Sequence, residues 1–445
     1  VYITGWFNNT VDFDPGVGTA NLTAAGNNDI YLAKYDANGN YVFAIGFGGT
    51  GVDAGFSLKV DGSGNAYVTG QFSNTVDFDP GVGTANLTSA GGTDIFFAKY
   101  DASGNYVFAK RMGGTNNDQA TSVALDGAGN IYISSYFANT VDFDPGAGTV
   151  NLVSAGLFDI AVAKYNTAGD YVYAFRIGSS SFDQANAIGV DASGNVYVAG
   201  YFDGFVDFDP GAGTAILTSS SSLDIFLAKY DASGNYVFAH KIGSTPGESA
   251  LGLALDGSGS VYISGYFQGI VDFDPGAGIA NLESTGSTDI FIAKYTAAGN
   301  YVFAKKIGSA GSDYGNSIAA DGNHLYVTGY INGMADTDPS TETINIETIN
   351  GIDSYIAKYI ICSSPALSAQ SISANPATVS GATSLTDGGC RLLAVVEPNG
   401  ASPVSGTVNA QLWIESSVPT FAGQPFVARH YEITPVTNPS TATGR

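Results

Sequence analysis

Short runs of mostly apolar residues alternate with polar turns along most of the chain. In one stretch, apolar runs at residues 56–60 and 66–72 flank the turn Asp-Gly-Ser-Gly-Asn, and runs at 94–100 and 106–110 flank Asp-Ala-Ser-Gly-Asn. Two β-forming runs joined by a Gly-Asn turn are typical of a β-hairpin. This stretch therefore predicts two hairpins, which give four antiparallel strands.

The same pattern returns at a constant step. The hexapeptide Val-Asp-Phe-Asp-Pro-Gly begins at Val11, Val76, Val141, Val206 and Val271, and a degraded copy begins at Ala335, one position short of the same step. A constant step of about 65 residues indicates one supersecondary unit used many times. We therefore assign residues 1–361 to a single repeat domain.

The hexapeptide lies between the second and third strands of each unit. In residues 76–88 it predicts a small hairpin, here called the arm, with a Pro-Gly turn. Because side chains alternate along a strand, Val76 and Phe78 are expected on one face of the arm and Asp77 and Asp79 on the other.

Six four-stranded sheets are compatible with a β-propeller, an open solenoid or separate beads. The sheet of a single repeat cannot bury both of its faces alone, and ring closure protects strand edges, so an all-β propeller of six, or with further repeats seven, blades is expected. Small residues such as Ala187 and Gly189 in the first strand suit the crowded centre of a ring. The first and fourth strands occur five times but the second and third six times, which predicts ring closure by strands upstream of Val1.

Two motifs carry a resemblance to a known family. Asp-x-x-Gly-Asn-x-Tyr-Val-x-Gly, followed by Asp-Ile-Phe-x-Ala-Lys-Tyr-Asp, resembles the bacterial β-propeller repeat called SBBP over residues 1 to about 360. The Asp-Phe-Asp-Pro-Gly arm resembles a variant typical of Bacteroidota surface proteins. The resemblance implies a propeller in a large exported protein, and type IX secretion.

Residues 362–445 lack the repeat. They are rich in Ser, Thr, Pro, Val and Ala, and we expect the start of a truncated β-sandwich-like module there. The only two cysteines, Cys362 and Cys390, form either one disulfide or two buried thiols. From the pattern at both ends, we expect the chain to be a fragment of a longer protein.

Net charge excludes one class of partner. The formal charge is −24, and only four of the 40 acidic residues follow residue 361. Since nucleic-acid binding depends on Lys and Arg, a nucleic-acid partner is excluded. No apolar run reaches the length of roughly 18 residues that a transmembrane helix needs, so the sequence predicts no membrane-spanning segment.

The paired aspartates of the arm are the main candidate site. Two carboxylates two residues apart repel each other unless a cation lies between them, and calcium is the cation that prefers such oxygen ligands. A third aspartate precedes the third strand of each unit and could return to the pair. The candidate calcium ligands, about one ion per blade, are Asp12, Asp14, Asp29, Asp77, Asp79, Asp94, Asp142, Asp144, Asp159, Asp207, Asp209, Asp224, Asp272, Asp274, Asp289, Asp336, Asp338 and Asp353. The alternative is a solvated strand face whose aspartates cap turn amides.

Other recurrent polar residues have simpler interpretations. Acids such as Asp53 in the loops between units are expected to bond backbone amides between blades, and the alternative is a cation-rich or ligand-binding surface. Acids such as Asp61 are expected to form turns. The lysine of each third strand, as in Lys99, is expected to pair with acids or to lie over aromatic neighbours. The histidines His240, His324 and His430 stand at unrelated repeat positions. We therefore predict no catalytic residue, since six near-identical carboxylate pairs indicate a repeated structural role.

These observations predict a non-catalytic, calcium-stabilised extracellular propeller, a structural or adhesive module of a large bacterial surface or secreted protein. Its partner would be a surface glycan or another surface protein. A carbohydrate-binding propeller is the first alternative, and a polysaccharide-cleaving enzyme is the second.

Overall fold

A computed structural model describes residues 1–220, 222–321, 324–337 and 345–361, together with six short strands between residues 383 and 444. Every regular element in these residues is a β-strand. The described part of the chain accordingly contains no helix with the length and apolar character that a membrane crossing requires. Six sheets account for the repeats, and their strands pair antiparallel in chain order.

The strands of the six sheets follow the repeat. The first sheet has β1 (Tyr2–Phe7), β4 (Asp29–Tyr35) and β5 (Tyr41–Phe47). The second has β6 (Ala54–Val60), β7 (Ala66–Asp77), β8 (Asn86–Tyr100) and β9 (Tyr106–Met112). The third has β10 (Gln119–Leu125), β11 (Ile131–Phe137), β14 (Asp159–Tyr165) and β15 (Tyr171–Ile177). The fourth has β16 (Gln184–Val190), β17 (Val196–Phe202), β20 (Asp224–Tyr230) and β21 (Tyr236–Ile242). The fifth has β22 (Ser249–Leu255), β23 (Val261–Phe267), β26 (Asp289–Tyr295) and β27 (Tyr301–Ile307). The sixth has β28 (Tyr314–Asp321), β29 (His324–Asp336), β30 (Asn345–Ile361) and β34 (Phe421–Ala422).

The arms form as predicted between the second and third strands. Four are separate hairpins, namely β2 (Thr10–Asp12) with β3 (Asn21–Thr23), β12 (Thr140–Asp142) with β13 (Asn151–Val153), β18 (Phe205–Asp207) with β19 (Ile216–Thr218), and β24 (Ile270–Asp272) with β25 (Asn281–Glu283). In the second and sixth sheets the arm continues the long strands β7–β8 and β29–β30.

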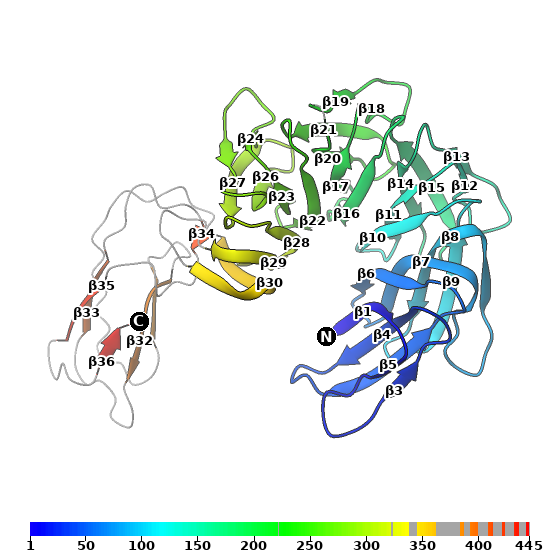
Figure 1. Cartoon of the computed structure of the whole chain (residues 1–445), viewed down its shortest axis with the longest axis horizontal. Coiled ribbons are helices and arrows are strands. Elements are labelled where there is room, and N and C mark those ends of the chain that lie inside the picture. The colour runs from blue at the N-terminus through cyan, green and yellow to red at the C-terminus, as the bar shows by residue number, and fades with distance from the viewer. Residues whose placement is uncertain are drawn as a thin grey trace.

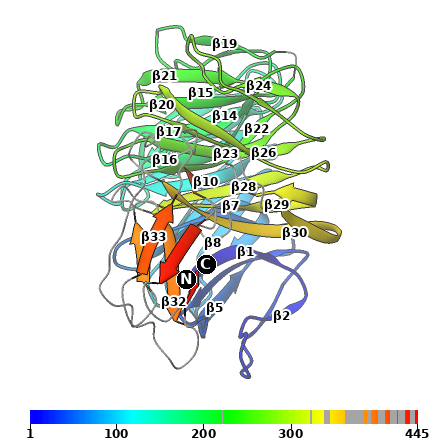
Figure 2. The ribbon, with the colours of Figure 1, turned by 90° about the vertical axis from the view of Figure 1, so that its left-hand side faces the viewer.

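The sheets follow one another around an arc as the blades of a propeller, which confirms the predicted fold class (Figure 1). The first strands of the second to sixth blades line the centre, around a cavity of about 340 Å³ that includes Val60, Leu125, Val190, Leu255 and Ala320. The view from the side shows the blades stacked face against face (Figure 2).

The hydrophobic core lies between neighbouring blades. Phe47 of the first blade packs against Phe78, Phe96 and Tyr100 of the second, with ring centroids 5.2–6.4 Å apart. Equivalent clusters join the later blades. Each blade is therefore stabilised by burial against the next blade, as expected for a sheet that cannot bury both faces alone.

The two blades at the ends of the arc differ from the others. The first sheet has three strands, as the strand count predicts, and its Ile3 is 43% exposed while the equivalent Ile133 is 1% exposed. In the sixth blade Ile356 is 73% exposed, although its equivalent Ile292 is fully buried. β34 pairs with the last two residues of β30, Ile360 and Ile361. Ring closure by strands upstream of Val1 stays a prediction. The first and sixth blades lie at opposite ends of the arc (Figure 1).

Beyond residue 361 the structure describes two further small sheets. One contains β31 (Thr383–Thr386), β32 (Leu392–Pro398) and β36 (Ala442–Gly444), and the other β33 (Val408–Leu412) and β35 (Tyr431–Pro435). The β-sandwich-like module remains a prediction. Cys362 and Cys390, which the sequence interpretation addressed, lie outside the described residues.

Candidate functional site

Each arm begins at a residue with left-handed backbone geometry. Asn9, Asn74 and Asn139 have φ values of 56°, 62° and 59°, and Gly204 and Gly269 take the same place in the next two blades with 83° and 70°. Only Gly and, among the other residues, mainly Asn and Asp tolerate this region readily. The residue type at this position therefore sets the bend where the chain leaves the blade for the arm.

The apolar side of the arm is held in the core. Val76 and Phe78 are fully buried, and Phe78 contacts Phe72 edge-on at 5.4 Å. The hydroxyl of Tyr100 donates a hydrogen bond of 2.9 Å to the Phe78 carbonyl. Equivalent tyrosines make this bond in every blade, namely Tyr35, Tyr165, Tyr230, Tyr295 and Tyr359. The side chain and the carbonyl of this phenylalanine thus both fasten the arm to its own blade.

The paired aspartates tie down the turn of the arm. Asp77 Oδ1 accepts the backbone N–H groups of Asp79 at 3.1 Å and Ala85 at 2.8 Å, and Asp79 Oδ1 accepts that of Gly81 at 2.8 Å. The pairs in the other described arms bond in the same way, at Asp12 and Asp14, Asp142 and Asp144, Asp207 and Asp209, and Asp272 and Asp274. These are the contacts of the turn-capping alternative. The second oxygen of each carboxylate is not used by these bonds.

The third aspartate of each predicted site occupies a different environment. Asp94 is fully buried within β8, opposite Phe72 of β7, and its Oδ2 accepts the N–H of Ala90 at 2.9 Å. Asp29, Asp159, Asp224 and Asp289 are buried in the same way, and Asp353 lies opposite Ile331 in the sixth blade. Within the described ranges, no three His, Cys, Asp or Glu side chains lie close enough to hold one metal ion. The structure thus keeps this aspartate apart from the arm pair. In the sixth arm, Asp336 ends β29 and Asp338 lies outside the described residues.

The buried aspartate has a basic partner that sequence reasoning missed. Arg111 Nη1 lies 2.5 Å from Asp94 Oδ2, and Arg176 contacts Asp159 in the same way. Lys241 and Lys306 lie 3.3 and 3.4 Å from Asp224 and Asp289. The sequence signal was a basic residue recurring 17 positions after the aspartate, on the next strand. These ion pairs join the third and fourth strands of one blade.

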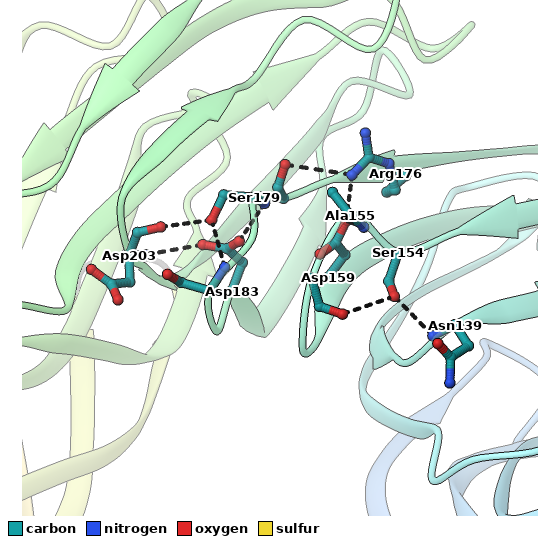
Figure 3. A network of polar contacts seen from close by, with 11 residues as sticks. Asn139, Ser154, Ala155, Asp159, Arg176, Ser179, Asp183 and Asp203 are labelled. Carbon is teal, nitrogen blue, oxygen red and sulfur yellow. Dashed lines mark hydrogen bonds and ion pairs between the residues drawn. The ribbon is translucent and has the colours of Figure 1, made fainter.

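A second buried carboxylate lies next to each of these aspartates. In the loop between β15 and β16, Asp183 accepts backbone N–H groups from Ser179 at 2.6 Å and Asp203 at 2.9 Å (Figure 3). Burial, helped by the negative charge of Asp159, raises the pKa of Asp183 to about 6. The same causes act on its equivalents, because burial with Asp94 raises the pKa of Asp118 to about 7, and burial with Asp224 raises the pKa of Glu248 to about 8. The expectation that these acids bond backbone amides between blades is confirmed.

The lysines of the third strands lie over aromatic rings, as expected. Lys99 Nζ is 4.8 Å from the centre of the Tyr67 ring, and the other five blades show the same contact at 4.7–5.4 Å. Such a cation–π contact holds the third strand against the second. The turn aspartates also behave as predicted, since Asp61 Oδ1 accepts the N–H groups of Ser63 and Asn65.

Comparison with known proteins finds relatives of low sequence identity. No family model matches it. It is 27% identical over 424 residues to an uncharacterized WD repeat-containing protein of Acanthamoeba polyphaga mimivirus, covering 79% of this chain and 30% of that protein. It is 27% identical over 297 residues to the regulatory protein FlaEY of Caulobacter vibrioides, covering 64% of this chain and 29% of that protein. The chain thus spans about three tenths of each relative. Together with the fold, these likenesses describe a propeller repeat module.

Proposed function

We propose that this chain is a non-catalytic structural or adhesive propeller module of a large exported bacterial protein, as its resemblance to SBBP repeats implies. The observation that carries the proposal is the repetition of one contact set in blade after blade. The arm tyrosine, the arm aspartates and the buried acids make equivalent bonds in successive blades. Enzymes normally concentrate chemistry at one site, whereas here the polar groups are used by the fold.

The arms supply the surface that meets a partner. Figure 1 shows them along the outer edge of the arc. Beyond the paired aspartates, Val17, Val82 and Ile279 are almost fully exposed. The first, second and fifth arms each expose an apolar side chain beside their acidic ones, which suits weak multivalent contact with a surface glycan or another surface protein.

Calcium belongs to this proposal as the ion of the arms. Each paired carboxylate offers one oxygen beyond the turn bonds, and the chain carries a formal charge of −24. Calcium prefers carboxylate and carbonyl oxygens, and it would reduce the repulsion within each pair. An extracellular location would supply this ion at millimolar concentration, the range in which extracellular modules bind it.

Co-sedimentation with insoluble bacterial and algal polysaccharides tests the proposal. We expect the intact chain not to shorten any polymer. Where it binds one, binding should weaken when Val82 and Ile279 are both replaced by Ser. A matched variant is Ser63→Ala, in the exposed turn between β6 and β7. Release of shorter sugar chains by the purified protein would overturn the non-catalytic assignment.

A further inference from the structure

One blade lacks the ion pair that its neighbours share. In the second to fifth blades, a basic side chain on the fourth strand contacts the buried aspartate of the third strand. The equivalent position in the first blade is Gly46 of β5, which lies opposite Tyr31 of β4. Asp29 therefore has no basic partner among the described residues.

The carboxylate of Asp29 is nevertheless buried. The residue is only 4% exposed, and its Oδ2 accepts the N–H of Ala25 at 2.9 Å. Its Oδ1 has no hydrogen-bond partner in the part of the chain that the structure describes, but this is true of the equivalent aspartates as well, because the basic residues of the other blades contact Oδ2. What sets the first blade apart is the missing contact at Oδ2. Burying a carboxylate without a counter-charge is costly, and this cost is what the basic residues offset in the other blades.

A second carboxylate adds to the negative charge at this place. Asp53 at the start of the second blade is fully buried, and it accepts backbone N–H groups from Gly49 at 2.8 Å and Ser73 at 2.9 Å. The charge of Asp29 contributes to the raised pKa of Asp53, after burial itself. Two neighbouring carboxylates with no basic side chain between them attract a cation.

The position of the missing charge can be reached from solvent. The basic side chains of the other blades are 30–35% exposed while they contact the buried carboxylate. In the third blade the guanidinium also lies 3.5 Å from the carbonyl of Gly178, whose equivalent in the first blade is Gly48. A cation at the same place would therefore meet carboxylate and carbonyl oxygens, and water on its exposed side.

We propose that Asp29, with Asp53 beside it, binds a hard metal cation at the place where the other blades hold an arginine or lysine. The ion would be of the calcium type, since all the protein ligands are oxygens and part of the shell is water. This site is distinct from the arm pairs, and it would occur once in the described blades rather than once per blade.

Thermal melting of the full chain in chelator-treated buffer, with CaCl₂ or with NaCl at equal ionic strength, tests the proposal. For the wild type we expect calcium to raise the midpoint by about 2 °C when its free concentration is ten times Kd. Gly46→Lys should raise the melting midpoint without calcium. It should also lose the part of the calcium-induced rise that comes from the site at Asp29. A Cβ at Gly46 would meet the side chains of Phe7 and Leu22 at 3.2–3.4 Å, so these side chains must shift by a few tenths of an ångström. Blades with the equivalent phenylalanine already hold a basic residue at this position.

Two further variants keep the test independent of how Gly46→Lys folds. Asp29→Asn should lose the same part of the calcium response, and Lys306→Ala in the fifth blade should gain one by exposing Asp289 as a second site. Calcium bound only by the arms would shift the wild type and Gly46→Lys equally, and this result would overturn the proposal. Absence of any wild-type response would also overturn it, because Asp29 would then be kept neutral by a proton.

Discussion

The buried acids between blades make individual residues sensitive to pH. The pKa of Glu248 is about 8 in the folded protein, against an ordinary value of 4.5, because burial and the nearby charge of Asp224 outweigh its bonds from Ser244 and the charge of Lys241. The folded state therefore keeps a proton that the unfolded chain releases as pH rises above about 4.5. The free energy of unfolding must fall as pH rises from there to about 8.

Glu248→Gln removes this titration while keeping an amide oxygen to accept the bonds from Ser244. We expect the variant to lose less stability than the wild type between pH 5 and pH 8, measured by urea unfolding at each pH. Asp183→Asn is the matched variant. Its effect should be complete by a lower pH, since the pKa of Asp183 is about 6. Equal pH dependence of wild type and Glu248→Gln would show that Glu248 is not the titrating group.

At the scale of one element, the arm separates turn capping from calcium binding. In the third blade, Asp142 and Asp144 accept the turn amides of Asp144, Gly146 and Val150. Replacing both aspartates by Asn keeps an acceptor oxygen at each position but removes both charges. We expect the double variant to unfold within about 0.5 kcal/mol of the wild type in chelator, because the capping bonds persist.

The same double variant should show a smaller calcium-induced rise of the melting midpoint than the wild type, in proportion to one arm among six. Replacing both residues by Ala is the control for capping, and it should cost about 1 kcal/mol without calcium, as the loss of a capping oxygen usually does. An unchanged calcium response in the double Asn variant would remove calcium from the proposed role of the arms.

For the whole molecule, position along the arc decides what a residue contributes. Ile3 and Ile133 are equivalent residues on β1 and β11, but Ile133 is 1% exposed and Ile3 is 43% exposed. Ile133→Ala removes buried methyl groups from the interface between the second and third blades and should lower the free energy of unfolding by about 2–5 kcal/mol. Ile3→Ala should cost less than about 1 kcal/mol, because its side chain already contacts solvent.

Urea unfolding of both variants measures this difference, with Ile263→Ala in the fifth blade as a second buried reference. Similar losses for Ile3 and Ile133 would mean that another surface covers the free face of the first blade in solution.

The repeat made much of this architecture predictable. Alternating apolar and polar residues and Gly-Asn turns predicted the hairpins, because these are local preferences of a few residues. The alternation of Val and Phe with Asp predicted which residues of the arm share a face, and the recurring lysines were predicted to contact acids or aromatic neighbours. The arm site was predicted less well, since the sequence placed Asp94 with Asp77 and Asp79 although the structure pairs it with Arg111. That partner lies on the neighbouring strand, and only the strand register shows which side chains meet.

Sequence alone therefore settled the all-β class, the length of the repeat unit, its four strands and its arm, since a strict repeat expresses local preferences many times over. The tertiary structure settled which carboxylates are buried, which have a basic partner, and which blade faces are covered. Those properties depend on contacts between strands and between blades. Gly46 illustrates the difference: in the sequence it is an ordinary glycine of a β-strand, and in the fold it leaves Asp29 without the counter-charge that four other blades provide.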